Sequence, residues 1–121
     1  MTADPVMAVV RVKAPAEVDP YVLEAELTRA ICTRSMTAEV VLLPSWRRGS
    51  RRGMRRYGFV AALSAPAARS ASELTGTAEK VLRKALRTRF GSAASAKVRL
   101  ARSAHEVDVL WCSVRGTPRR P

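Results

Sequence analysis

The apolar positions of this chain fall into short runs that predict strands. Residues 6–12 are almost continuously apolar and β-branched, and residues 37–43 end in four consecutive aliphatic side chains, so both runs predict buried strands. Residues 56–64 form a third run of this kind. Residues 96–101 alternate between apolar and basic side chains, which predicts a half-exposed strand. Residues 107–114 are mainly apolar again and predict one further strand.

Two longer stretches carry helical periodicity and recognisable helix boundaries. Asp19 can cap free amide groups and Pro20 suits the first helical position, so a helix is expected from Pro20 to about Arg34. The segment from Ser70 to Glu73 matches a capping box, and Gly91 can end the helix that follows it. The two apolar stripes contain Leu23, Leu27, Ala30 and Ile31 in the first helix, and Leu74, Ala78, Val81, Leu82, Ala85 and Leu86 in the second.

The order of these elements predicts the fold class. Strand, helix, strand, strand, helix and strand, followed by an extra C-terminal strand, predict an α+β, ferredoxin-like split β-α-β sandwich with two helices on one face of an antiparallel sheet. A length of 121 residues fits a single domain. We expect that domain at residues 6–115, between a flexible terminus at 1–5 and a disordered basic tail at 116–121.

The connector between the second and third strands is rich in arginine. Residues 46–56 read W-R-R-G-S-R-R-G-M-R-R, in which three Arg pairs recur every four residues: Arg47 and Arg48, Arg51 and Arg52, and Arg55 and Arg56. Such a connector is longer than the usual hairpin loop, so we expect it to be mobile and functional. Arg is well suited to bind phosphate or carboxylate because its guanidinium group offers a fork of donors. The alternative is a solubilising surface loop.

The net charge of the chain agrees with an anionic partner. The formal net charge is +12, with 18 Arg and 4 Lys. This balance favours nucleic acid, an acidic protein or an anionic membrane surface. A GC-rich coding sequence would also raise the Arg content without any functional cause.

A second basic group lies on the second predicted helix. Lys80, Arg83, Lys84 and Arg87 have the i, i+3, i+4, i+7 spacing that places them in one stripe. This stripe is either a solvated helix face or part of the same anion-binding surface as the Arg connector. The choice depends on whether the two lie on the same side of the fold.

The sequence offers little for catalysis or for a cofactor. It has a single histidine, His105, and no glycine-rich phosphate motif before a helix. Cys32 and Cys112 lack metal-ligand spacing and are expected to be reduced and buried, as in a cytosolic protein, with a disulfide bridge as the alternative. We therefore expect a cytoplasmic protein that is not an enzyme, that uses no metal or other cofactor, and that has no membrane span.

One segment resembles a known family. Residues 55–62 read R-R-Y-G-F-V-A-A and resemble the octapeptide of RNA-recognition-motif domains, in which this segment is the third strand. Arg56 and Ala62 depart from the pattern, and residues 6–12 contain no aromatic side chain. The resemblance implies that Tyr57 and Phe59, which alternation places on one face, stack on bases if that face is open. Otherwise both are ordinary strand aromatics.

Two hypotheses for function follow. The first is a small non-enzymatic binding module for an anionic polymer, RNA more than DNA, that binds through the six loop arginines with Tyr57, Phe59 and the helix stripe. The second is a protein–protein assembly subunit that oligomerises with itself or docks on an acidic partner through its sheet face or edge. Trp46 and Trp111 are expected to be packing residues rather than stacking platforms. In the second hypothesis, the extra terminal strand with Trp111 would suit the interface.

Overall fold

The structure, a computed structural model, describes part of the chain in detail. The described residues are 5–33, 36–49, 53–65, 70–103 and 105–106, with the backbone alone described for 44–49. Several expectations therefore lie outside the described residues: those for the N-terminus at 1–4, for Arg51 and Arg52, and for the last strand, Trp111, Cys112 and the tail within 107–121.

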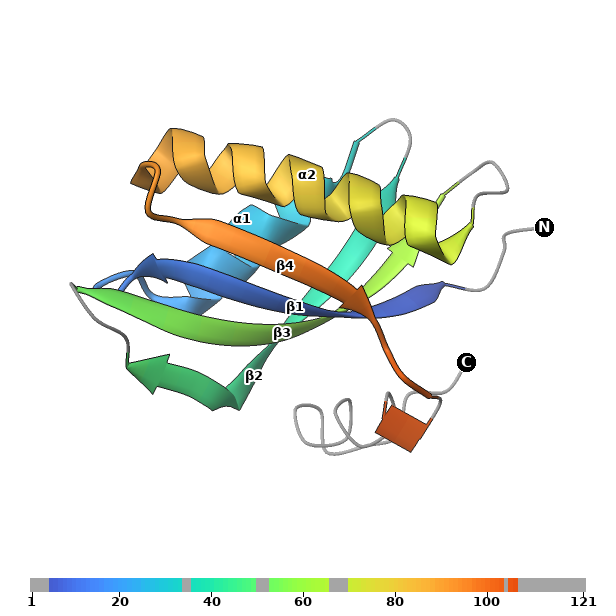
Figure 1. The fold of residues 1–121 in the computed structure, drawn as a ribbon, viewed down its shortest axis with the longest axis horizontal. Helices are drawn as coiled ribbons and strands as arrows, with labels where there is room; N and C mark the ends of the chain where they lie inside the picture. Colours follow the sequence, from blue (N-terminus) through green and yellow to red (C-terminus); the bar gives the residue numbers. More distant parts are fainter. Residues whose placement is uncertain (1–4, 34–35, 50–52, 66–69, 104, 107–121) are drawn as a thin grey trace.

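The described residues form the expected α+β fold (Figure 1). The elements are β1 (Val6–Pro15), α1 (Pro20–Ile31), β2 (Thr37–Gly49), β3 (Met54–Ser64), α2 (Ala71–Phe90) and β4 (Ser95–Leu100). The strands form one antiparallel sheet in the order β2-β3-β1-β4, and both helices pack on the same face of it. This is a split β-α-β arrangement, so the prediction of the fold class is confirmed.

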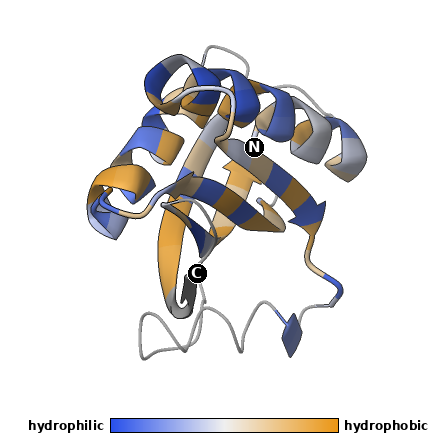
Figure 2. Ribbon diagram, turned by 60° about the vertical axis from the view of Figure 1, so that its left-hand side comes forward, coloured by the Kyte–Doolittle hydropathy of each residue, from blue (hydrophilic) through white to orange (hydrophobic). Residues whose placement is uncertain are grey.

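The two central strands, β1 and β3, place their side chains alternately on the two faces of the sheet. Their register runs from Val6 opposite Leu63 to Pro15 opposite Met54. Successive strand residues point to opposite faces, so alternate residues of both strands pack under the helices in the main core. Figure 2 shows these strands as largely hydrophobic beneath the more hydrophilic α2. We call the face away from the helices the outer face.

The helix boundaries follow the capping residues. The Asp19 side chain accepts a hydrogen bond from the Tyr21 amide at 2.8 Å, and the Ser70 hydroxyl accepts one from the Glu73 amide at 3.2 Å. Gly91 ends α2 with a φ of 93°, a conformation that favours glycine. Both N-terminal caps and the C-terminal stop of α2 are thus confirmed.

The first helix is shorter than expected, and its cysteine is not buried. The helix was expected to reach about residue 34, but it ends at Ile31 because Cys32 adopts an extended backbone. The Thr33 amide then donates to the Met36 carbonyl at 2.8 Å, which turns the chain toward β2. Cys32 is a free, exposed thiol, so the expectation that it is buried was wrong.

The Arg connector is in part a paired hairpin. Residues 46–56 were expected to form a long loop, but β2 continues to Gly49 and pairs there with Arg55 of β3. A shift in register between Leu43 and Arg48 accommodates Pro44, which has no amide hydrogen to donate to the ladder. Only residues 50–53 therefore separate the two strands. Gly53 has a φ of 74°, and its carbonyl accepts a hydrogen bond from the Ala16 amide at 2.7 Å.

Carboxylates from the helices cap both edges of the sheet. On β2, the Leu42 amide donates to Glu24 Oε2 of α1 at 2.7 Å. On β4, the Val98 amide donates to Glu79 Oε1 of α2 at 2.8 Å. Arg83 Nε also donates to the Ala96 carbonyl at 2.9 Å. Each helix thereby satisfies edge groups that another strand would otherwise use for pairing.

The cap on β4 gives a test of this interpretation. Replacing Glu79 with Ala leaves the half-buried Val98 amide without its acceptor, and we expect a loss of about 1–2 kcal/mol in the free energy of unfolding. Glu79→Gln should cost less, since its amide oxygen can still accept. Urea denaturation measures both effects, with Glu17→Ala at an exposed position as the control. Equal stabilities of the Glu79→Ala and Glu17→Ala proteins would contradict the capping role.

Candidate anion-binding surfaces

The outer face of the sheet carries four basic side chains at one end. Because the alternate residues of β1, β3 and β4 pack under the helices, the intervening positions point to the outer face. We name this group the outer-face cluster: Arg11 and Lys13 from β1, Arg56 from β3 and Lys97 from β4. Lys13 is half-buried and the other three are exposed, so their cationic groups are accessible to a large anionic partner.

The strand register places like charges directly opposite one another in this cluster. Lys13 of β1 is opposite Arg56 of β3, and Arg11 of β1 is opposite Lys97 of β4. Directly opposed like charges destabilise a sheet. Within the part of the chain that the structure describes, no carboxylate forms an ion pair with Lys13, Arg56 or Lys97. These charges are thus available to an external anion.

The ladder extends the cluster toward the Arg hairpin. Arg48 of β2 pairs in register with Arg56 of β3, which in turn pairs with Lys13 of β1. Three neighbouring strands therefore each contribute one basic residue to a single row across the sheet.

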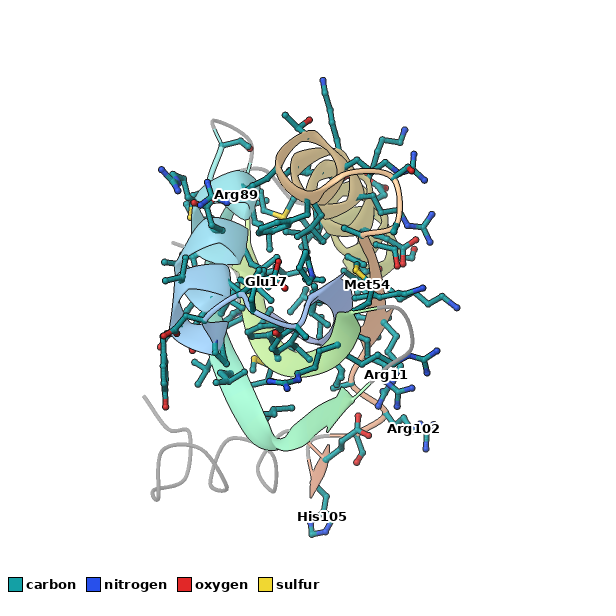
Figure 3. The ribbon with its side chains drawn as sticks, turned by 90° about the vertical axis from the view of Figure 1, so that its left-hand side faces the viewer. Arg11, Glu17, Met54, Arg89, Arg102 and His105 are labelled. Carbon is teal, nitrogen blue, oxygen red and sulfur yellow. The ribbon has the colours of Figure 1, made fainter. Side chains whose placement is uncertain are left out.

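In Figure 3, Arg11 and Arg102 lie on the same side of the molecule, away from α1. Arg102 follows β4, so the basic region continues beyond the end of that strand.

Arg99 on the outer face is neutralised by a carboxylate. Arg99 of β4 donates from both terminal nitrogens to the two carboxylate oxygens of Glu106, at 3.1 and 3.2 Å. The hydrogen bond from Arg99, followed by that from the Arg102 amide, lowers the pKa of the Glu106 carboxyl below its usual value. The pair is lost only when the pH falls through that lowered pKa. Arg99 is therefore a structural contact at neutral pH rather than a free cation.

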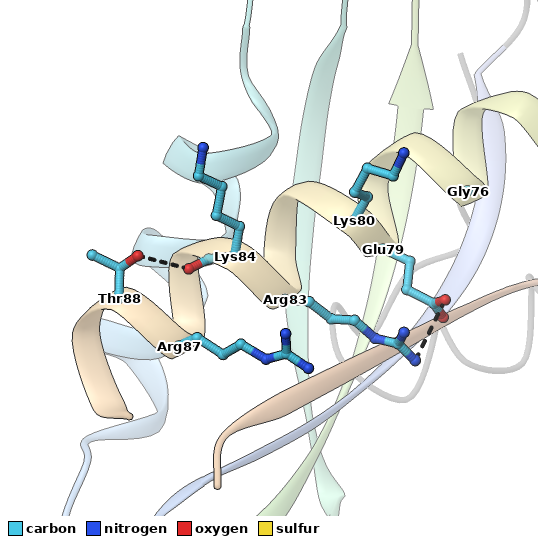
Figure 4. A pocket seen from close by; sticks show the side chains of 7 residues that line it. All are labelled: Gly76, Glu79, Lys80, Arg83, Lys84, Arg87 and Thr88. Atoms are coloured by element: carbon cyan, nitrogen blue, oxygen red, sulfur yellow. Dashed lines mark hydrogen bonds and ion pairs between the residues drawn. The ribbon is translucent and has the colours of Figure 1, made fainter. Parts of the chain in front are cut away.

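The basic stripe on α2 forms a second surface (Figure 4). Lys80 and Lys84 form one row along the helix, while Arg83 and Arg87 form another that points toward β4. Together they line an open groove of about 470 Å³. Arg83 is held by Glu79 at 3.6 Å and by the Ala96 carbonyl, whereas Lys80, Lys84 and Arg87 have no ion-pair partner among the described residues.

The two basic surfaces lie on different layers of the fold. The helix stripe is on α2, which covers one face of the sheet, while the outer-face cluster is on the other face. They are connected at β4, because Arg83 contacts the backbone of Ala96 and the next residue, Lys97, belongs to the cluster. Figure 1 also shows the C-terminal end of α2, the end of β1 and the start of β3 at the same end of the molecule. The stripe and the hairpin therefore belong to different layers of the fold rather than to one flat surface.

The two aromatic residues expected to stack on bases are in the core. Tyr57 and Phe59 do share a face, as alternation predicted, but that face is covered by the helices. Tyr57 is 1% exposed and Phe59 is 0% exposed. The Tyr57 hydroxyl lies 3.1 Å from the Val18 carbonyl and 3.3 Å from that of Pro15, so its polar end is occupied as well. The condition for base stacking is not met, and both are core aromatics.

The loop arginines do not form one surface. Arg47 and Arg48 belong to β2, where the backbone alone is described, and Arg51 and Arg52 lie outside the described residues. Arg55 is half-buried on the helix-facing side, opposite Ala14, whereas Arg56 points to the outer face. The hairpin pairing thus separates two arginines that are adjacent in sequence.

Sequence reasoning missed Arg11, Lys13 and Lys97 as members of a site. The i, i+2 spacing of Arg11 and Lys13 in an apolar strand indicates that both point to one face. Their position opposite Arg56 and Lys97 depends on the strand order, which the sequence pattern does not give. The register of β1 with its two neighbours brings the three strands' charges together.

Other kinds of site have no counterpart in the described part of the chain. There, no group of three or more His, Cys, Asp or Glu side chains is placed to hold a metal ion. No helix among the described residues is long and apolar enough to span a membrane. Elsewhere on the outer face, Met7, Val41, Leu43 and Val60 form an apolar cluster in which no side chain is more than 9% exposed.

Comparisons with known proteins add little to this description. No family model matches the chain, and no curated protein matches it. Among solved structures, the chain is similar to the Bacillus subtilis YXEP protein, described as a dinuclear metal-binding peptidase of the M20 family, with a TM-score of 0.46 and 7% sequence identity. The match covers 79% of this chain and 25% of that one, so the chain spans about a quarter of its length.

The opposed charges predict an unusual effect on stability. Lys13→Gln removes the like-charge contact with Arg56, and we expect it to raise the free energy of unfolding by up to about 1 kcal/mol at low salt. The gain should shrink at high salt, where the repulsion is already screened. Urea denaturation at two salt concentrations measures this. A loss of stability that is independent of salt would contradict the repulsion.

The position of Tyr57 predicts a separation of stability from binding. Tyr57→Phe removes the hydroxyl that contacts the Val18 and Pro15 carbonyls, so we expect a loss of about 1 kcal/mol in the free energy of unfolding. Because the ring is buried, the affinity for single-stranded RNA should not change in the folded protein. Thermal unfolding and RNA titration measure the two effects. Weaker RNA binding by a fully folded Tyr57→Phe protein would contradict the core assignment.

Proposed function

We propose that this protein binds nucleic acid through contacts between phosphates and the outer-face cluster, extended by the Arg hairpin. The observation that carries the proposal is the opposition of Lys13 to Arg56 across neighbouring strands. A phosphate backbone brings negative charge to several of these side chains at once and converts their repulsion into attraction. The partners of this protein are then nucleic acids, and the activity is binding without chemical change.

The burial of Tyr57 and Phe59 changes the expected mode of binding. An RNA preference was expected because aromatic side chains on an open strand face stack on unpaired bases. With both rings in the core, the binding energy comes from phosphate contacts, which carry no sequence information. We therefore propose binding that depends on charge, with RNA still a ligand but with little discrimination between single-stranded RNA and duplex DNA.

The alternative, an assembly subunit that docks through its sheet, receives less support. Glu24 and Glu79 occupy amides of the two edge strands that strand addition requires. The apolar cluster of the outer face is buried, so among the described residues it offers no open hydrophobic surface to a partner. A phosphate-binding function needs neither an open edge nor an apolar face.

The proposal predicts a change in salt dependence. We expect binding of labelled single-stranded RNA to weaken steeply with salt, and the Lys13→Gln/Arg56→Gln double variant to reduce the log–log slope by roughly 1.5. The physical reason is that a variant with fewer phosphate contacts releases fewer counterions from the RNA when it binds. Fluorescence anisotropy across a salt series, with duplex DNA in parallel, measures the slopes.

A charge-matched control is available on the other side of the fold. Arg29 and Arg89 both form ion pairs with Glu26, so the Arg29→Gln/Arg89→Gln double variant lowers the net charge equally without touching the cluster. It should keep a slope close to that of the wild type. Equal reductions in the two double variants would show that net charge alone drives binding, and absence of wild-type binding to either nucleic acid would refute the function.

A further inference from the structure

The α2 groove contains a glycine that the fold does not require. Gly76 lies within the helix, where glycine costs about 1 kcal/mol relative to alanine. In the described structure, a Cβ atom added at Gly76 would meet no atom within 4 Å beyond its chain neighbours and the nearby backbone of its own helix, and the Gly76 backbone is not in the left-handed region. Packing and backbone conformation therefore both permit a larger residue at this position.

Gly76 lies at the junction of two hollows on the exposed side of α2. The groove lined by the basic stripe has a volume of about 470 Å³, and a second hollow toward the start of the helix has about 520 Å³. Gly76 and Lys80 line both of them. The two hollows thus share part of their lining along α2, and Gly76 is a position without a side chain toward the N-terminal part of this stretch (Figure 4).

The charges of the groove repel one another. Lys80 and Lys84 are four residues apart, as are Arg83 and Arg87, and like charges at this spacing destabilise a helix. Among the basic side chains of this groove, Arg83 is the one that forms an ion pair with a described carboxylate, that of Glu79. From Gly76 to Arg87 the helix extends roughly 16 Å, which is long enough to follow several successive phosphates of one strand.

We propose that one strand of the bound nucleic acid runs along α2 and passes directly over Gly76, with its phosphates on Lys80, Lys84 and Arg87. This rests on the function proposed above and adds a path from the outer-face cluster, around β4, to the helix. Glycine allows a sugar-phosphate backbone to approach the helix closely, whereas a side chain at this position would hold it away. The basic rows then contact the strand on both sides of its path.

The experiment compares stability with affinity in the full chain. Gly76→Ala should raise the unfolding midpoint by about 3–6 °C because alanine favours the helix. The same variant should weaken binding of labelled single-stranded RNA roughly 3- to 10-fold, as for the loss of about one contact. Lys80→Gln/Lys84→Gln should also weaken binding and lower the salt slope. Unchanged affinity in Gly76→Ala would overturn the proposed path.

The control is a helix-stabilising change away from the groove. Val22 on α1 is 47% exposed, so Val22→Ala should also stabilise the protein, but it should leave the affinity unchanged. If Lys13→Gln/Arg56→Gln weakens binding and Gly76→Ala does not, the α2 path fails and the proposed function stands. If wild type binds no RNA, both fail. Tighter binding of polyglutamate than of RNA at the same salt would overturn the path in favour of an acidic protein.

Discussion

The antiparallel ladder between β1 and β3 is the constraint on which the rest of the structure depends. Because side chains alternate along paired strands, one register assigns every residue of the two central strands to a face. The assignment that buries Phe59 under the helices also sends Lys13 and Arg56 outward. The same register therefore determines the core and the charged outer face, and a shift by one residue would exchange them.

Much of the fold could be predicted because its signals are local. The alternation within strands, the Asp19 and Ser70 caps and the Gly91 stop depend on neighbours in sequence, and each is present in the structure. The hairpin was predicted less well, because Pro44 and the glycines around Arg51 indicate a break. Pairing with β3 overrides these signals when a change in register lets β2 bypass the proline.

The candidate site was harder to predict because it is made by strand order. Lys13 and Arg56 are far apart in sequence, and no periodic pattern relates them before β1 is known to lie beside β3. The roles of Glu24 and Glu79 were missed for a related reason. Each is on a helix surface by its periodicity, but its carboxylate binds an amide of an edge strand. The hydropathy pattern of the sequence does not predict a hydrogen bond of this kind.

Closed edges and crowded cations together restrict the kind of ligand that this fold can accept. Since Glu79 and Arg83 occupy backbone groups of β4, a partner at that edge meets side chains and not free strand amides. On either side of β4 those side chains are basic, and they oppose like charges across the sheet and along α2. An extended anion relieves both repulsions at once, whereas a compact ligand would reach only one. This relief of repulsion is the physical basis on which we propose a polymer that follows the surface around β4.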